Sequence, residues 1–134
     1  MKTSSIIQAV KLAHKLGHIF VATADAKGMP HVAAAAAMSS IAENKVAVSA
    51  WFCPGTLVNL DQNRLVSLIV WDEAADSGYQ LLGRVDNIYE KAVMNGYLSG
   101  AEHLAPLPQV ERILDVAVDK VITFSHAPHS DVEE

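Results

Sequence analysis

The sequence predicts a mainly β protein in which a mostly antiparallel sheet closes into a small barrel, with helices at its flanks. Three observations lead to this fold class. The 134 residues suit one domain, short apolar segments separated by turn residues recur along the chain, and there is no βαβ alternation. We expect a single domain over residues 1–134, comprising an N-terminal helix (1–17), a barrel (18–125) and a loose tail (126–134).

The N-terminal third of the sequence predicts a helix followed by a β-hairpin. Apolar residues recur every three or four positions over residues 4–16, lysines lie between them, and a glycine ends the pattern. Residues 18–23 and 31–38 predict two strands joined by a tight turn at residues 25–28. Residues 33–37 are five consecutive alanines, so a short helix is the competing interpretation of the second strand. We prefer the hairpin because the turn leaves little room for anything else.

The rest of the chain predicts four further strands and two further helical regions, which brings the strand count to six. The strands cover residues 46–52, 65–71, 79–89 and 113–124. Gly83 interrupts the third of these and predicts a bend or a close approach of two backbones. A short helix is expected over residues 56–62 with Thr56 as its N-cap. A second helical region is expected over residues 90–104.

The composition excludes several classes of protein. Hydrophobic residues make up 51% of the chain, yet only 6% are aromatic and 20 residues are alanine. Cys53 is the single cysteine, so neither an internal disulfide nor a thiolate-rich zinc site is expected, and nothing indicates secretion. No apolar stretch is long enough for a transmembrane helix, and ten Lys and Arg without a cluster argue against nucleic acid. We expect a cytoplasmic protein that binds neither nucleic acid nor membranes.

Three local patterns, in a fixed order, point to a family. They are GHIFVATADAKGMPHV at residues 17–32, TLVNLDQNRLVSL at 56–68 and GYQLLGRV at 78–85. Together they resemble the pyridoxamine 5′-phosphate oxidase-like, FMN-binding split-barrel superfamily, and in size the chain is most similar to its small FMN-binding members. The resemblance extends over about residues 17–125. It implies a six-stranded antiparallel split β-barrel that forms a homodimer with two flavins at the subunit interface.

The resemblance also implies where the flavin lies. The ring would lie along the second strand, and the phosphate would lie near the end of the third strand and the start of the following helix. The implied residues are Ala33, Ala34, Ala35 and Ala36 for the ring, and Ser49, Ala50, Trp51, Thr56 and Asn59 for the phosphate region. Elementary chemistry supports part of this assignment, because a helix start offers unpaired N–H groups and the positive end of the helix dipole. Small side chains also suit a flat ligand.

One feature departs from the family pattern. Members usually carry a lysine or arginine just before the threonine, whereas residues 53–55 are Cys-Pro-Gly here and carry no charge. Arg84 or Lys120, from the partner subunit, are candidates to supply the missing cation. Structural alternatives stay open as well. The alanines would suit a tightly packed strand between layers or subunits. Thr56 would serve as an ordinary helix cap, and Asn59 would form a hydrogen bond to the preceding turn.

Other reactive side chains do not assemble into a site. His126 and His129 have metal-ligand spacing, but Asp131 is the one acidic or thiolate residue near them, so no metal site is expected. No basic neighbour in sequence activates Cys53. His31 follows the turn proline, and for it a structural or cofactor-edge role is favoured over catalysis. No catalytic residue is assigned.

These observations lead to a functional hypothesis with one alternative. We predict an FMN-binding flavoprotein and flavin-dependent oxidoreductase, in which the flavin carries the chemistry and the protein positions it. With only three arginines, true pyridoxamine 5′-phosphate oxidase activity is not expected. The alternative is a dimer of the same fold with a binding or regulatory role, either free of cofactor or holding another planar ligand such as haem or a deazaflavin.

Overall fold

The computed structural model describes residues 2–51, 54–94, 109–126 and 130–133. Two helices and eight strands lie in this part of the chain. In order they are α1 (Lys2–Leu16), β1 (Ile19–Ala24), β2 (Pro30–Ala35), β3 (Ala37–Ala42), β4 (Lys45–Trp51), α2 (Pro54–Gln62), β5 (Leu65–Asp72), β6 (Ser77–Met94), β7 (Gln109–Ser125) and β8 (Ser130–Glu133).

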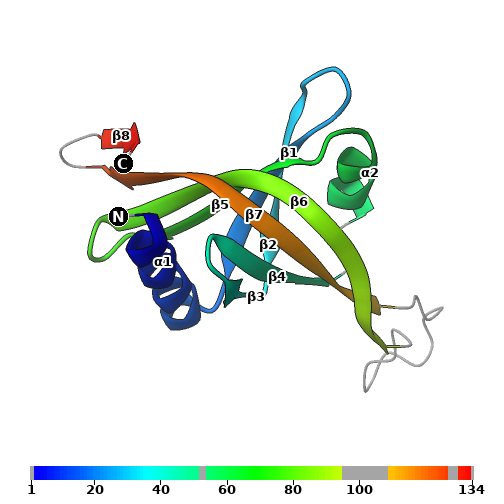
Figure 1. Ribbon diagram of the computed structural model, residues 1–134, viewed down its shortest axis with the longest axis horizontal. Coiled ribbons are helices and arrows are strands. Elements are labelled where there is room, and N and C mark those ends of the chain that lie inside the picture. Colours follow the sequence, from blue (N-terminus) through cyan, green and yellow to red (C-terminus); the bar gives the residue numbers. More distant parts are fainter. Residues whose placement is uncertain (1, 52–53, 95–108, 127–129, 134) are drawn as a thin grey trace.

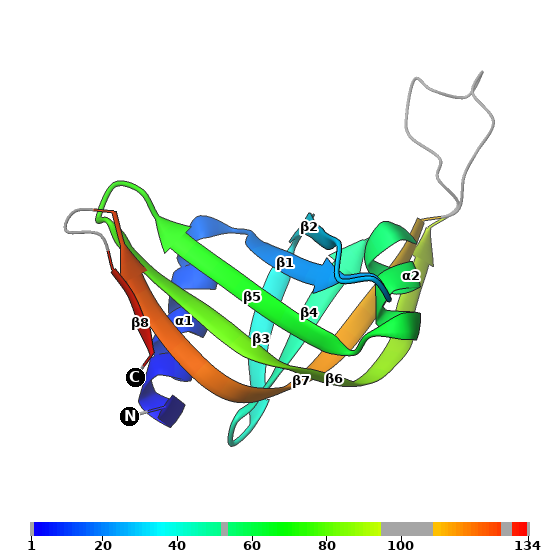
Figure 2. The ribbon, with the colours of Figure 1, turned by 90° about the horizontal axis from the view of Figure 1, so that it is seen from above.

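All strands belong to one antiparallel sheet that curls into a barrel without closing. The strand order is β2-β1-β5-β6-β7-β4-β3, and β8 pairs with β7 beside this path. Among the described residues, no hydrogen-bonded ladder joins the end strands β2 and β3. Figure 2 shows the long strands β5, β6 and β7 lying side by side across the molecule. The predicted mainly β, antiparallel split-barrel class is confirmed, with eight strands rather than six.

The predicted strand over residues 31–38 is in fact two strands. β2 pairs with β1, β3 pairs with β4, and Ala36 alone separates them. The Ala36 N–H donates a hydrogen bond of 3.0 Å to the Ser49 carbonyl. The chain therefore passes from one end strand of the sheet to the other at this residue. A run of alanines contains no turn signal, so the local sequence carries no sign of the crossing.

Two further expectations are corrected near the C-terminus. Residues 90–94, predicted as the start of a helix, continue β6, and Glu90 pairs with Arg112 of β7. Pairing with a distant strand overrides the local preference for helix here, and residues 95–108 lie outside the described part. The tail predicted to be loose over residues 126–134 contains β8, in which Val132 pairs with Thr123.

The helices lie at opposite ends of the barrel (Figures 1 and 2). α1 buries one face, formed by Ile6, Ala9, Val10 and Ala13, in a core that includes Ile19, Leu68, Leu81, Leu114 and Val116. This spacing is the helical one that the sequence predicts. α2 buries Leu60 at the other end. Neither of these described helices is long and apolar enough to span a membrane.

Gly83 lies at a close approach of β6 and β7. The pairing register shifts between Leu82 and Gly83. A Cβ atom at Gly83 would collide with the carbonyl oxygen of Ala117 and would lie 3.1 Å from the Cα of Val118. The predicted close backbone approach is confirmed, and it coincides with a β-bulge.

Candidate functional site

A hollow of about 390 Å³ lies where the β1–β2 turn meets the start of α2. Figure 1 shows this hairpin and α2 at the same end of the molecule. We call the hollow the α2 pocket. Its walls are Asp25, Met29, Pro30, His31, Pro54, Gly55, Val58 and Asn59.

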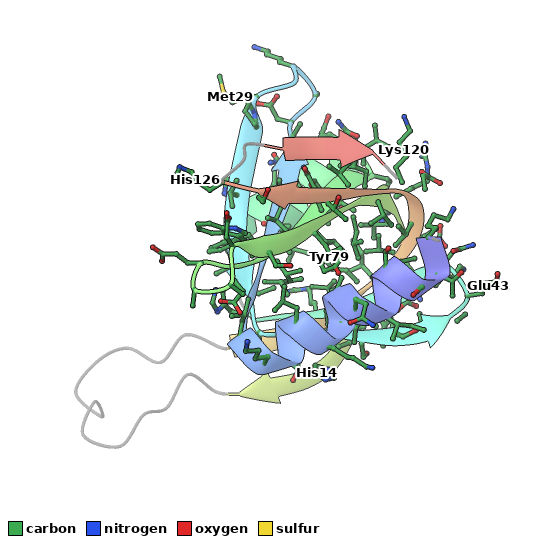
Figure 3. All side chains as sticks on the ribbon, turned by 90° about the vertical axis from the view of Figure 1, so that its left-hand side faces the viewer. His14, Met29, Glu43, Tyr79, Lys120 and His126 are labelled. Carbon is green, nitrogen blue, oxygen red and sulfur yellow. The ribbon has the colours of Figure 1, made fainter. Side chains whose placement is uncertain are left out.

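The β1–β2 turn forms one wall and is fixed by Asp25. Its Oδ1 accepts hydrogen bonds from the backbone N–H groups of Lys27 (2.8 Å) and Met29 (2.9 Å), an arrangement typical of Asp in turns. Gly28 takes a φ of 87°, a conformation that glycine adopts without strain. Met29, the residue directly before β2, lies on the opposite side of the molecule from His14 of α1 (Figure 3). The next residues lead into β2.

The other wall is the first turn of α2, which begins earlier than predicted. Pro54 is the first helical residue, a position that suits proline because its missing N–H would have no partner in the helix. Thr56 is consequently the third residue of the helix rather than its N-cap, and that prediction is wrong. Its side chain is 2% exposed, and its Oγ1 is buried without a hydrogen-bond partner among the described residues.

Asn59 fastens α2 to the sheet. Its Nδ2 donates a hydrogen bond of 3.0 Å to Oγ1 of Thr23 in β1, and both side chains are buried. The structural alternative, a bond to the preceding turn, is therefore replaced by a contact with a residue 36 positions away. Asn59 still forms part of the α2 pocket.

The alanines implied for the flavin ring do not share one face. Ala35 is buried in the core at 6% exposure, Ala34 and Ala36 are exposed, and Ala33 is half-buried. The alternation follows from the two-residue period of a strand. Only Ala34 and Ala36 of this set are fully open to a ligand from outside the barrel.

The implied residues of β4 lie in a second group. Ser49 donates a hydrogen bond of 2.6 Å from Oγ to Oε1 of Glu111 in β7. Ala50 and Trp51 pair with Arg112 and Glu111 through the backbone, and their side chains lie outside the described part. β2 contacts both α2 and β4, so this strand connects the two groups of implied residues.

The charges near these groups are few. Of the described residues that line the α2 pocket, His31 is the one able to carry a positive charge. Lys120 lines a different hollow, of about 440 Å³, together with Leu65 and Gly83, and Arg84 pairs with Leu65 on the same sheet. Within the described ranges, no three His, Cys, Asp or Glu residues gather as metal ligands. His129 is not among the described residues.

Sequence reasoning did not place Asp25 or Val58 in a site. The turn signal around residue 25 was present, but the sequence alone did not show that this turn would meet α2. That meeting depends on the pairing of β1 with β2 and on the bond from Asn59 to Thr23.

Comparison with known proteins gives one family. The sequence model of the pyridoxamine 5′-phosphate oxidase family matches residues 7–124. No curated protein matches the chain.

Several solved structures share the fold. A Clostridium acetobutylicum protein related to general stress protein 26 of B. subtilis has a TM-score of 0.65 at 15% identity, covering 100% of this chain and 96% of that one. A pyridoxamine 5′-phosphate oxidase-related, FMN-binding protein from Nostoc punctiforme has a TM-score of 0.63 at 11% identity, covering 92% and 84%. An F420 reductase has a TM-score of 0.53 at 19% identity, covering 78% and 87%. At these identities the likeness is one of fold.

Proposed function

The chain belongs to the pyridoxamine 5′-phosphate oxidase family, and we propose that it is a flavoprotein that binds FMN and acts as a flavin-dependent oxidoreductase. The family match over residues 7–124 supports the proposal. So does the fold shared with an FMN-binding relative from Nostoc punctiforme.

The observation that carries the proposal is the start of α2. Thr56 holds a buried hydroxyl without a described partner, and a buried donor of this kind calls for a ligand or water to satisfy it. The absence of a side chain at Gly55 lets the His31 ring approach the first turn of the helix, and the helix start favours an anion. These residues fit the phosphate of FMN: Asn59 lines the α2 pocket, and the Thr56 hydroxyl lies buried in the first turn of the helix behind it. Bound flavin would supply the electron transfer.

The ring would lie along the other implied residues. Ala34 and Ala36 offer an exposed surface of small side chains, and Ser49 pairs with Ala37 in the neighbouring ladder. Ala33, Ala50 and Trp51 stay part of the proposed site. Ala35, which packs in the core, would contribute through its backbone alone.

We also propose a homodimer, formed through the outer face of β1, β2 and β5. Phe20 pairs with Ala34 on one side and with Ile69 on the other, so their side chains share a face. Phe20 is 41% exposed and Val32 is 58% exposed. A contiguous exposed apolar face of this kind is characteristic of an interface. A second copy would also cover part of the apolar excess seen in the composition.

The direct test is the visible absorption spectrum of the protein as isolated, followed by titration with FMN. We expect a flavin spectrum that survives desalting, and quenching of FMN fluorescence that saturates at one FMN per chain. A protein that stays colourless after soaking in FMN and desalting would contradict the proposal.

The alternative is another planar ligand, such as haem or a deazaflavin, or a regulatory dimer without cofactor. Two observations favour it. Among the described residues, no lysine or arginine lines the α2 pocket, and the hydroxyl of Ser49 already donates a hydrogen bond to the carboxylate of Glu111. The F420 reductase among the structural neighbours supports the deazaflavin variant. A thermal-shift comparison of FMN, haem and a deazaflavin separates these cases, because the specific ligand stabilises the folded protein by mass action.

A further inference from the structure

His31 lies against the first turn of α2. A Cβ atom at Gly55 would be 2.9 Å from Nε2 and 3.2 Å from Cε1 of His31, so the absence of a side chain at position 55 allows the ring to approach the helix backbone. The imidazole is exposed and lines the α2 pocket. The ring is therefore held at the helix end whose backbone N–H groups have no acceptors within the helix.

The charges around this ring favour an anion. The first turn of α2 contributes the positive end of the helix dipole, and the α2 residues that line the pocket include no titratable side chain. Among the described lining residues, Asp25 of the β1–β2 turn is the other titratable one, and its Oδ1 already accepts two backbone N–H groups. Across the described residues, the His31 ring has no hydrogen-bond partner and no ion-pair partner. Its nitrogens are therefore available to a ligand.

We propose that His31 and the first turn of α2 form the phosphate subsite of the α2 pocket, and that the charge on His31 sets how tightly a phosphate ester binds. The inference rests on the proposed function, in which that ester is FMN. A phosphate ester carries close to two negative charges at neutral pH, and cationic N–H donors are its strongest partners. Histidine changes charge between pH 5 and 8. The affinity for a phosphate ester therefore depends on pH in this range.

The test compares FMN with riboflavin, which is the same molecule without the phosphate. Dissociation constants for both ligands are measured by fluorescence quenching for the wild-type protein and for His31→Gln at pH 6.5. We expect His31→Gln to weaken FMN about tenfold, the effect of one charge-assisted hydrogen bond, and to leave riboflavin unchanged. His18→Gln is the matched control, since His18 is exposed and does not line the α2 pocket. It should alter neither constant.

The pH dependence gives a second readout. Between pH 7 and 8.5, carboxylates ordinarily stay ionised and the phosphate of FMN is mainly the dianion. The ratio of wild-type to His31→Gln affinity for FMN should therefore fall toward one as the pH rises from 7 to 8.5. His31→Lys keeps a positive charge across this range. We expect it to bind FMN more tightly than His31→Gln does, by a factor that does not change with pH.

The outcomes separate this inference from the function on which it rests. Equal FMN affinity for wild type and His31→Gln would overturn the phosphate subsite and leave the flavoprotein proposal standing. An equal loss of affinity for FMN and for riboflavin would assign His31 a contact with the flavin ring, which both ligands contain. It would likewise overturn the phosphate subsite. If the wild-type protein binds neither ligand, the proposed function fails and the subsite fails with it. Circular dichroism of each variant checks that it is folded.

Discussion

At the scale of single residues, the most unusual group is the hydroxyl of Thr56. A buried hydroxyl without a partner lowers stability by about 1–3 kcal/mol, yet this one lies in the first turn of α2, at 2% exposure. A group that weakens the unliganded protein and donates to a ligand should affect stability and binding in opposite directions.

Thr56→Val tests this expectation, since valine has nearly the same shape and lacks the hydroxyl. We expect the free energy of unfolding without ligand to stay the same or rise by up to about 1 kcal/mol, and FMN affinity to fall about tenfold. Urea unfolding and fluorescence titration measure the two effects. Thr56→Ser, which keeps the hydroxyl, is the control for binding. A loss of stability in Thr56→Val without loss of affinity would contradict the assignment.

At the scale of elements, α1 is held to β5 by an ion pair. Lys15 Nζ lies 3.0 Å from Oδ2 of Asp72, and Oδ1 of Asp72 accepts the backbone N–H of Ala74 at 3.0 Å. The hydrogen bond from Lys15 lowers the pKa of Asp72, and it outweighs the burial that would raise this pKa.

The lowered pKa of Asp72 predicts a dependence of stability on pH. Because the folded-state pKa lies below the unfolded-state value, the contribution is fully present above about pH 5 and is lost as the pH falls through the folded-state pKa. We expect Asp72→Asn to be less stable than wild type at pH 7, by a difference that shrinks as the pH falls toward 3. Unfolding midpoints at pH 7, 5, 4 and 3 measure the difference. A difference that persists unchanged at pH 3 would show that the charge of Asp72 is not its source.

The bulge between β6 and β7 gives a second element-scale prediction. Gly83→Ala places a methyl group against the carbonyl of Ala117. A flexible side chain could move aside for this methyl group, but the paired backbones of β6 and β7 cannot. We expect a loss of about 1–3 kcal/mol in the free energy of unfolding. Arg84→Ala, at the next and exposed position, should change it by less than about 0.5 kcal/mol. Equal effects of the two variants would contradict the close approach.

The elements differ in how well local sequence predicts them. α1 follows from its helical periodicity, and β5 from its nearly continuous run of apolar residues. The crossing at Ala36 and the strand over residues 90–94 do not, since each depends on a partner strand far along the chain. The site shows the same division. Thr56 and Asn59 are implied by the resemblance to the family, whereas the meeting of Asp25 and His31 with Gly55 depends on how β1, β2 and α2 pack together.

At the scale of the whole molecule, the outer face of β1, β2 and β5 makes the proposed dimer testable. Phe20→Asp places a charge in the middle of this face, and a charge buried without a partner opposes association. We expect sedimentation to report a dimer for wild type and a monomer for Phe20→Asp. Ile7→Asp is the control, because Ile7 is 44% exposed on α1 and should leave the dimer intact. A wild-type monomer at micromolar concentration would refute the dimer.

The single residue between β2 and β3 also affects the accuracy with which the sheet is aligned. A slip of one residue turns every side chain of a strand to the opposite face, and five successive alanines offer no pattern that would penalise such a slip locally. Because Ala35 is aligned with Ile19 and Ala37 with Ser49, and only Ala36 lies between them, β2 cannot shift along β1 unless β3 shifts along β4. Each alignment therefore constrains the other, and the two partner strands together fix the register of a segment that has no sequence pattern of its own.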